Sequence, residues 1–335
     1  MIDDIGVAIF FFNRPKPLEK VFQAVREAKV KKLFLIQDGA RKGNELDIEK
    51  VKLCRDIVSN IDWDCKVYTN FSEVNLSCDH RVFTGISWAF EFVDKLIILE
   101  DDCLPSQSFF PFCESILNKY QNDPRVLMVS GMNYFDEHIT DGSSYFFSNS
   151  ACGWGWATWK RSWDTAIEQS NFEFLNDKYL KNIIKQNIKS LGYKLSSMNK
   201  FLSIVQKIRE LNLKTNKVNS WEYALGISKL LNSSLIITPT KNLISNIGLT
   251  DDSTHAVNNI QKLDVITQKL FFKKTYEIEF PLVHPKYVIR NLDYEQKHAK
   301  VFRPTMLRIV EGNIRRLIYS NNIERKKMFK KLIKK

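Results

Sequence analysis

Short apolar runs alternate with amphipathic segments through the first 130 residues, and this alternation limits the fold more than any other feature. Continuous apolar runs are typical of strands buried on both faces of a parallel sheet. The predicted strands are 6–12, 32–37, 66–68, 95–99 and 126–130. Helices are predicted between these strands where apolar residues recur at helical spacing: over 18–25, up to residue 93 and over 109–120. Asp79 is the predicted cap of the second of these helices. We therefore expect an α/β fold: a Rossmann-like, mainly parallel sheet flanked by helices.

The regular alternation of predicted strands and helices ends after Gly131. Further strands are predicted at 145–147, 235–238 and 243–245, and a Trp-rich loop at 153–156. A polar, lysine-rich segment at about residues 165–215 is predicted as a helical insertion. We expect three parts: a first half over 1–131, a second half over 132–300 that contains the insertion, and a basic helical tail over 301–335.

No apolar run reaches the roughly 18 residues that a membrane-spanning helix needs. The N-terminal residues lack the basic segment and the cleavage site of a signal peptide. None of the six cysteines forms a C-x-x-C pair, which argues against a zinc or thioredoxin-like site. We expect a cytoplasmic protein whose cysteines are reduced and act as small buried apolar residues.

Three consecutive acids, Glu100, Asp101 and Asp102, follow the predicted strand 95–99. Ligands of open parallel sheets bind beyond the carboxyl ends of the strands. Carboxylates this close together are costly unless a cation offsets them, and oxygen ligands suit Mn²⁺ or Mg²⁺. Such an ion could hold a diphosphate and stabilise it as it leaves. The alternative is that the acids cap the helix that follows Pro105.

Other polar residues at strand ends are candidates of the same kind. Arg14 could contact a phosphate through its guanidinium group, although a lone arginine is more often a surface residue. Asp38 could accept hydrogen bonds from a base or a ribose, although Asp-Gly is usually a turn. Both follow predicted strands. Their value as candidates depends on whether the sheet brings them to the acidic triplet.

Three further candidates lie in the second half. Glu222 starts a predicted helix and could act as a general base, or it is simply an acid favoured by the helix dipole. His255 lies in a polar loop and could bind a metal or phosphate, although a lone histidine is more often an ordinary surface residue. Tryptophans around Trp154 and Trp156 offer flat apolar faces for sugar rings, and core packing is the alternative.

Taken in order, these segments resemble a known family. They are Phe12-Asn13-Arg14-Pro15, Gln37-Asp38, Asp79-His80-Arg81, Ile98 to Asp102, Gly153-Trp154-Gly155-Trp156, Trp221-Glu222 and the loop from Asn246 to His255. The set resembles the GT-A glycosyltransferases, especially the N-acetylglucosaminyltransferase I type and its bacterial relatives, which are similar to family 2. The resemblance covers about residues 5–256 and implies a nucleotide-sugar-binding first half and an acceptor-binding, catalytic second half.

The resemblance also implies a role for each matching residue. Arg14 would lie near the donor phosphates, Asp38 at the uracil and His80 at the nucleotide. Glu100 and Asp101 would hold the ribose and the sugar, and Asp102 would bind Mn²⁺ or Mg²⁺ directly. His255 would be a second ligand of the metal or the diphosphate. Trp154, Gly155, Trp156 and Trp221 would shape the sugar or acceptor pocket.

The resemblance implies an inverting transfer of a hexosyl or N-acetylhexosaminyl group from a UDP-sugar to a hydroxyl of a glycan or lipid-linked acceptor. Glu222 stands where the family has an aspartate as catalytic base. Such a chain would serve bacterial surface polysaccharide synthesis. Two alternatives stay open: a nucleotidyltransferase on a similar fold, which would usually show a Gly-rich loop where Asn13-Arg14-Pro15 stands, and an inactive relative that binds nucleic acid or membrane.

The net charge of +12 is concentrated in the tail. Residues 301–335 hold eleven basic and two acidic side chains, so the rest of the chain carries only +3. Apolar residues at helical spacing from Met306 onward are interleaved with the basic ones. We expect residues 306–335 to contact an anionic membrane surface, the inner face of the cell membrane. A solvated tail or an oligomer contact is the alternative. No nucleic-acid motif is present, and we expect no nucleic acid partner.

Overall fold

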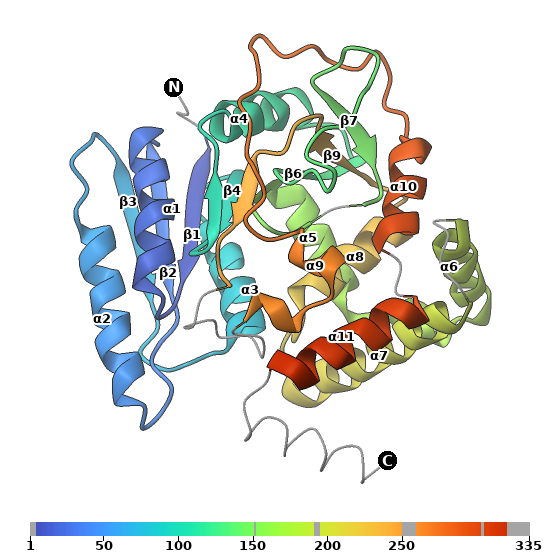
Figure 1. Ribbon diagram of the computed structural model, residues 1–335, viewed down its shortest axis with the longest axis horizontal. Helices are drawn as coiled ribbons and strands as arrows, with labels where there is room; N and C mark the ends of the chain where they lie inside the picture. The colour runs from blue at the N-terminus through green and yellow to red at the C-terminus, as the bar shows by residue number, and fades with distance from the viewer. Residues whose placement is uncertain (1–4, 151, 191–194, 250–258, 303–304, 320–335) are drawn as a thin grey trace.

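The computed structural model describes residues 5–150, 152–190, 195–249, 259–302 and 305–319. Eight strands form one sheet in the order β3-β2-β1-β4-β8-β6-β9-β7 (Figure 1). They are β1 (Gly6–Phe11), β2 (Lys32–Gln37), β3 (Lys66–Phe71), β4 (Lys95–Glu100), β6 (Val126–Ser130), β7 (Tyr145–Ser148), β8 (Trp156–Trp159) and β9 (Leu235–Pro239). In a small second sheet β5 (Cys103–Pro105) pairs with β10 (Ile244–Asn246). Only β7 and β8 run against the other strands of the large sheet, which confirms the predicted mainly parallel α/β fold.

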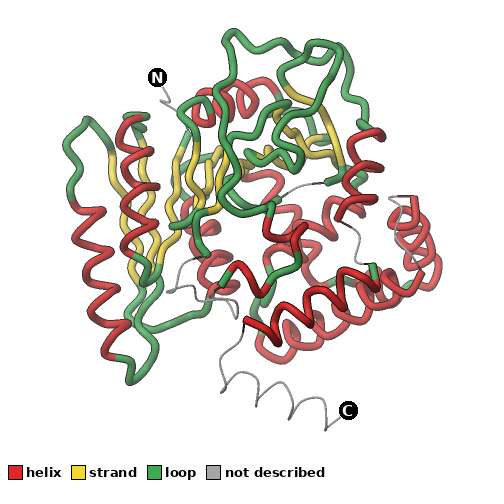
Figure 2. Tube along the Cα trace, in the orientation of Figure 1, coloured by secondary structure: helices red, strands yellow, loops and turns green. Residues whose placement is uncertain are grey.

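Helices cover both faces of this sheet, which runs through the middle of the molecule in Figure 2. The longer helices are α1 (Pro15–Glu27), α2 (Glu45–Ser59), α3 (Cys78–Ala89), α4 (Phe109–Lys119), α5 (Lys160–Glu168), α6 (Lys178–Ser190), α7 (Leu195–Thr215), α8 (Trp221–Leu231), α10 (Leu292–Phe302) and α11 (Met306–Tyr319). The short ones are α9 (Val265–Gln268) and the 3₁₀ turns η1 (Gln169–Asn171), η2 (Glu173–Asn176) and η3 (Ile260–Lys262). None of the helices within the described ranges is long and apolar enough to cross a membrane.

Alternate residues of each central strand enter two different cores, because successive side chains of a strand point to opposite faces. Val7 and Ile9 of β1 join the core beneath α1, α2 and α4. Ala8 and Phe10 join the core beneath α3, α5 and α8. Every residue of β1 is buried, as expected for a central strand covered on both faces. A third core holds the helices of the inserted segment, α6 and α7, against η2 and α8.

Three elements of the first 160 residues were not predicted from the sequence: α2, β5 and β8. The Trp-rich segment predicted as a loop through Trp156 instead ends in β8, the antiparallel strand between β4 and β6. All four residues of β8 are buried. A second difference concerns Asp79, which lies in the first turn of α3; the N-cap is Ser77.

The sheet brings the ends of three parallel strands to one edge. Phe11 of β1 is opposite Gln37 of β2, and Phe10 is opposite Glu100 of β4. The residues that follow these strands therefore meet beyond the same edge. The chain supplies Arg14, Asp38 and the Glu100–Asp102 triplet to this place.

Candidate functional site

Arg14 binds both aspartates of the acidic triplet. One of its terminal nitrogens donates to Asp102 Oδ2 at 2.7 Å, and the other forms an ion pair with Asp101 Oδ1. All three side chains are buried. Burial lowers the pKa of Arg14, but the adjacent carboxylates outweigh it and raise the pKa above its ordinary value. The triplet is therefore no simple helix cap, since two of its members hold a buried guanidinium group.

Backbone contacts fix the two aspartates at the end of β4. Asp101 accepts from Phe12 N at 3.3 Å through Oδ2, so it ties the exit of β1 to that of β4. The carbonyl oxygen of Asp102 accepts from Ile247 N at 2.8 Å. A Cβ on Gly248 would lie 1.9 Å from Asp102 Oδ2, so only glycine allows this loop to approach the carboxylate so closely.

Glu100 is the last residue of β4 and is half-buried. Burial first, and then the charges of Asp102 and Asp101, raise the pKa of Glu100 to about 8. Arg14 binds only the two aspartates, and its charge lowers the pKa of Glu100 by less than burial and the aspartates raise it. A further positive charge would therefore stabilise the ionised form of this cluster. Within the described ranges, no three His, Cys, Asp or Glu side chains lie close enough together to hold a metal ion by themselves.

A cleft of about 240 Å³ opens beyond the ends of β1, β2 and β4; we call it the β2–β4 cleft. Its polar lining includes Arg14, Asp38, Arg81 and Glu100. Asp38 is buried, and its Oδ1 accepts from the backbone nitrogens of Gly39 at 2.9 Å and Leu76 at 2.7 Å. Burial raises the pKa of Asp38, although these two hydrogen bonds act against it.

Arg81 was not singled out as a site residue from the sequence, which pointed to its neighbour His80. The Arg81 guanidinium is buried, donates to Gln37 O at 3.0 Å and lines the β2–β4 cleft. His80 is half-buried, and its Nδ1 has no hydrogen-bond partner among the described residues. His80 is not part of the cleft lining. The one sequence signal for Arg81 as a site residue is that it belongs to the motif Asp79-His80-Arg81.

A larger cavity of about 780 Å³ adjoins this cleft; we call it the α8 cavity. Glu100 and Cys78 line both spaces, so the two meet at the end of β4. Glu222, Leu225, Gly226 and Lys229 line the α8 cavity from one face of α8. From Glu222 to Lys229 the helix rises about 10 Å, so this face is long enough to accompany an extended ligand.

The tryptophans divide into two groups. Trp154 and Trp221 line the α8 cavity. Trp156 is fully buried in β8 and stacks under Trp221, with ring centroids 5.3 Å apart. Gly155 has φ +60° and packs against Ile244, where a Cβ would lie 2.3 Å from a side-chain carbon. Trp156 and Gly155 therefore pack behind residues that line the cavity and do not line it themselves.

His255, which the resemblance implies as a second ligand of the metal or the diphosphate, lies outside the described residues.

The lining of the α8 cavity also includes groups that the sequence did not indicate: Lys229 of α8, and Glu295 and His298 of α10. Burial lowers the pKa of Lys229 to about 8. Lys229 Nζ donates to the carbonyl oxygen of Asn149, whose backbone nitrogen donates to Glu295 at 2.6 Å. This network joins α8 to α10 across residue 149.

His298 gives the α8 cavity a pH-dependent wall. Burial, and then the charge of Lys229, lower the pKa of His298 to about 4. The folded state therefore takes up fewer protons than the unfolded state between pH 6.5 and 4, and stability falls as the pH falls through this window.

The His298→Asn variant removes this titrating group. Between pH 7 and 4.5, its free energy of unfolding, measured with urea, should fall by about 2 to 3 kcal/mol less than that of the parent. If the free energy of unfolding fell equally in both proteins, His298 would have the same pKa in the folded and unfolded states.

No protein-family model matches the chain, and no curated protein matches it. Among solved structures, the chain is similar to UDP-glucose pyrophosphorylase complexed with UDP-glucose, with 10% identity, a TM-score of 0.37, and coverage of 72% of this chain and 93% of that one. It is also similar to 4-diphosphocytidyl-2C-methyl-D-erythritol synthase from Anaerococcus prevotii, with 13% identity, a TM-score of 0.31, and coverage of 61% and 85%.

Proposed function

We propose that the protein is a glycosyltransferase that binds a UDP-sugar with its nucleotide in the β2–β4 cleft and its sugar in the α8 cavity. The observation that carries the proposal is the meeting of these two spaces at Glu100. A nucleotide-sugar has two parts of different chemistry, joined by a diphosphate. The site has two adjoining spaces with a charged cluster at the junction.

In this arrangement the polar groups of the β2–β4 cleft select the nucleoside. Two backbone donors fix Asp38 Oδ1, and Asn75 Nδ2 donates to Oδ2 at 3.0 Å. The second lone pair of Oδ2 would be the preset acceptor for the base. Arg14 lies at the diphosphate end with Asp101 and Asp102. A phosphate that approaches Arg14 would compete with the aspartates for the guanidinium group, which frees a carboxylate for a cation.

Asp102 lines neither the β2–β4 cleft nor the α8 cavity, but Arg14 holds it beside Asp101 and Glu100, which do. From there it could offer one carboxylate to a divalent ion. Mg²⁺ and related ions are commonly held by one or two carboxylates together with substrate phosphates and water. Arg14 occupies Asp102 Oδ2, whereas Asp102 Oδ1 accepts, among the described residues, only from the weak thiol donor Cys103 Sγ and, at a long 3.5 Å, from Asn246 Nδ2. When bound, Mn²⁺ or Mg²⁺ would neutralise charge on the departing diphosphate.

Glu222 is the proposed general base. Its side chain is exposed and lines the α8 cavity from the first turn of α8, and Glu100 lines the same cavity. The acceptor oxygen forms a bond to the anomeric carbon while the bond from that carbon to the diphosphate oxygen breaks. The hydroxyl proton passes to Glu222, and the bonding electrons leave with UDP. Trp154 and Trp221 offer apolar faces to the sugar or the acceptor.

Asp38→Asn should weaken UDP binding by about 10- to 100-fold. A single amide oxygen cannot accept from Gly39 N, Leu76 N, Asn75 Nδ2 and the base as the two carboxylate oxygens do. Isothermal titration calorimetry with UDP measures the change. Asp123→Asn is the matched control, since Asp123 precedes β6 at the opposite edge of the sheet. Equal UDP affinity in the parent and Asp38→Asn would remove the nucleoside from this cleft.

A panel of UDP-, GDP- and CMP-sugars with Mn²⁺, scored by thermal shift, tests the donor class. We expect selective stabilisation by UDP-sugars. Release of pyrophosphate from UTP and a sugar phosphate would instead establish the nucleotidyltransferase alternative.

A further inference from the structure

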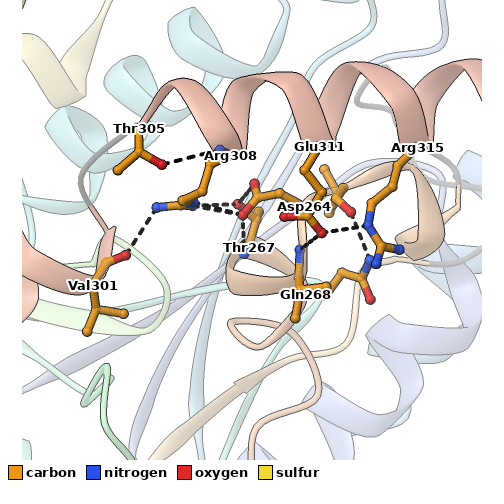
Figure 3. A network of polar contacts seen from close by, with 10 residues as sticks. Asp264, Thr267, Gln268, Val301, Thr305, Arg308, Glu311 and Arg315 are labelled. Atoms are coloured by element: carbon orange, nitrogen blue, oxygen red, sulfur yellow. Dashed lines mark hydrogen bonds and ion pairs between the residues drawn. The ribbon is translucent and has the colours of Figure 1, made fainter.

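Helix α11 packs against the rest of the protein through its polar side (Figure 3). Arg308 forms an ion pair with Asp264 at 2.9 Å and donates to the carbonyl oxygen of Val301 at 3.2 Å. Glu311 accepts from the backbone nitrogen of Val265 at 3.4 Å and from Arg315 at 2.8 Å. Arg308 and Asp264 are only 18% and 17% exposed, so this polar contact forms the inner face of the helix.

The apolar side of the same helix faces outward. Met306, Leu307, Val310 and Ile314, which we call the α11 stripe, are 77%, 82%, 49% and 51% exposed. Leu307, Val310 and Ile314 have the i, i+3, i+7 spacing that places side chains on one face. A surface helix of a globular protein normally buries such a stripe and exposes its charges. In α11 this orientation is reversed, which implies that something outside the described chain covers the stripe.

We propose that the α11 stripe inserts into the interface of an anionic lipid membrane. The charge of the chain favours this occupant over a second copy. The sixteen residues that follow Tyr319 contain seven basic side chains and one acidic side chain. A second copy paired through α11 would add another segment of the same charge to the assembly, whereas an anionic lipid surface attracts each basic segment. Basic residues next to an exposed apolar helix face are the usual composition of interfacial membrane helices.

Helix α11 follows closely in the chain on α10, which helps to line the α8 cavity. His298 and Ala299 of α10 line that cavity, and α10 ends at Phe302, a few residues before α11 begins at Met306. An acceptor anchored in the same membrane would be presented close to the cavity. This consequence rests on the proposed function, but docking of the stripe does not.

Sedimentation of the full chain with vesicles tests the docking. The vesicles are phosphatidylcholine alone or mixed with phosphatidylglycerol. We expect binding to the mixed vesicles only, weakened by salt. The triple variant L307Q/V310Q/I314Q leaves the charge unchanged and should lower the partition coefficient at least roughly a hundredfold, because three apolar side chains lose their burial. The control L46Q/I48Q/L53Q removes similarly exposed apolar residues of α2, which are 57%, 52% and 44% exposed, and should bind like the parent.

Three results would overturn the docking proposal. They are equal binding of the stripe variant and the parent, no binding of the parent to anionic vesicles, and a parent dimer by sedimentation velocity that the stripe variant converts to a monomer without any vesicle binding. A UDP thermal shift is measured on every variant. An unchanged shift shows that the variant is folded, and it reports on the proposed function separately, because no residue of the stripe lines either cavity.

Discussion

Glu222→Gln is expected to lower turnover about 10²- to 10⁴-fold, the usual contribution of a general base. UDP affinity should stay nearly unchanged, because Glu222 lines the α8 cavity and not the β2–β4 cleft. Glutamine keeps the size of the side chain but cannot accept the hydroxyl proton. Turnover is measured as UDP release at a saturating UDP-sugar concentration, and affinity by calorimetry.

Glu45→Gln is the matched control for this variant. Glu45 is also a first-turn acid, at the start of α2, and is exposed. Both substitutions remove the same favourable interaction with a helix dipole, so any difference in turnover belongs to the cavity. A Glu222→Gln enzyme with parental turnover would exclude Glu222 as the base.

Arg14→Leu is expected to destabilise the protein by about 3 to 5 kcal/mol, the cost of leaving one partner of a buried ion pair without its counter-charge. The ion pairs are enclosed: the Arg14 side chain is 10% exposed, and those of Asp101 and Asp102 are 3% and 11% exposed. Urea unfolding measures the free energy of unfolding. Adding Asp101→Asn to Arg14→Leu should recover part of the loss, because one of the uncompensated charges is then removed.

Arg26→Leu serves as the control. Arg26 pairs with Asp62 at the surface, where the side chains are 38% and 49% exposed. Solvent-exposed ion pairs contribute little to stability, so this variant should unfold like the parent. If Arg14→Leu also unfolded like the parent, the acidic cluster would not depend on Arg14 for its charge balance.

The sequence was a good guide to the buried strands. β1, β2, β4 and β6 are continuous apolar runs, and their predicted bounds agree with the structure to within one residue. β8 could not be predicted from an apolar run, because it has only four residues and follows a glycine-containing, Trp-rich segment that also fits a loop. Helix α2 escaped prediction because its buried side is narrow: Asp47, Val51, Cys54 and Val58.

The site was predictable where it follows strand ends. Arg14, Asp38 and the acidic triplet could be expected together, since parallel strands end at one edge. Their pairing could not be predicted, because Arg14 and Asp101 are 87 residues apart and meet only through the order of β1 and β4. The same limit applies to Lys229 and His298, which come together from α8 and α10. Isolated residues on helices carry no sequence signal of a shared cavity.

The outward orientation of the apolar side of α11 could not be predicted from the sequence either. The spacing of apolar residues predicts an amphipathic helix from Met306 onward, and the helix extends to Tyr319 within the described residues. Periodicity does not tell which side faces the protein. The contact between Arg308 and Asp264 decides it, and Asp264 lies in a segment for which no element was predicted.

Phosphorus NMR of the full chain with UDP-sugars, Mn²⁺ and candidate acceptors tests the central claim most directly, because it identifies the phosphorus product of the reaction. A nucleotide held in the β2–β4 cleft with its sugar in the α8 cavity should release UDP, and Glu222→Gln should slow that release. Formation of pyrophosphate from UTP and a sugar phosphate, with no UDP from any UDP-sugar, would contradict the account.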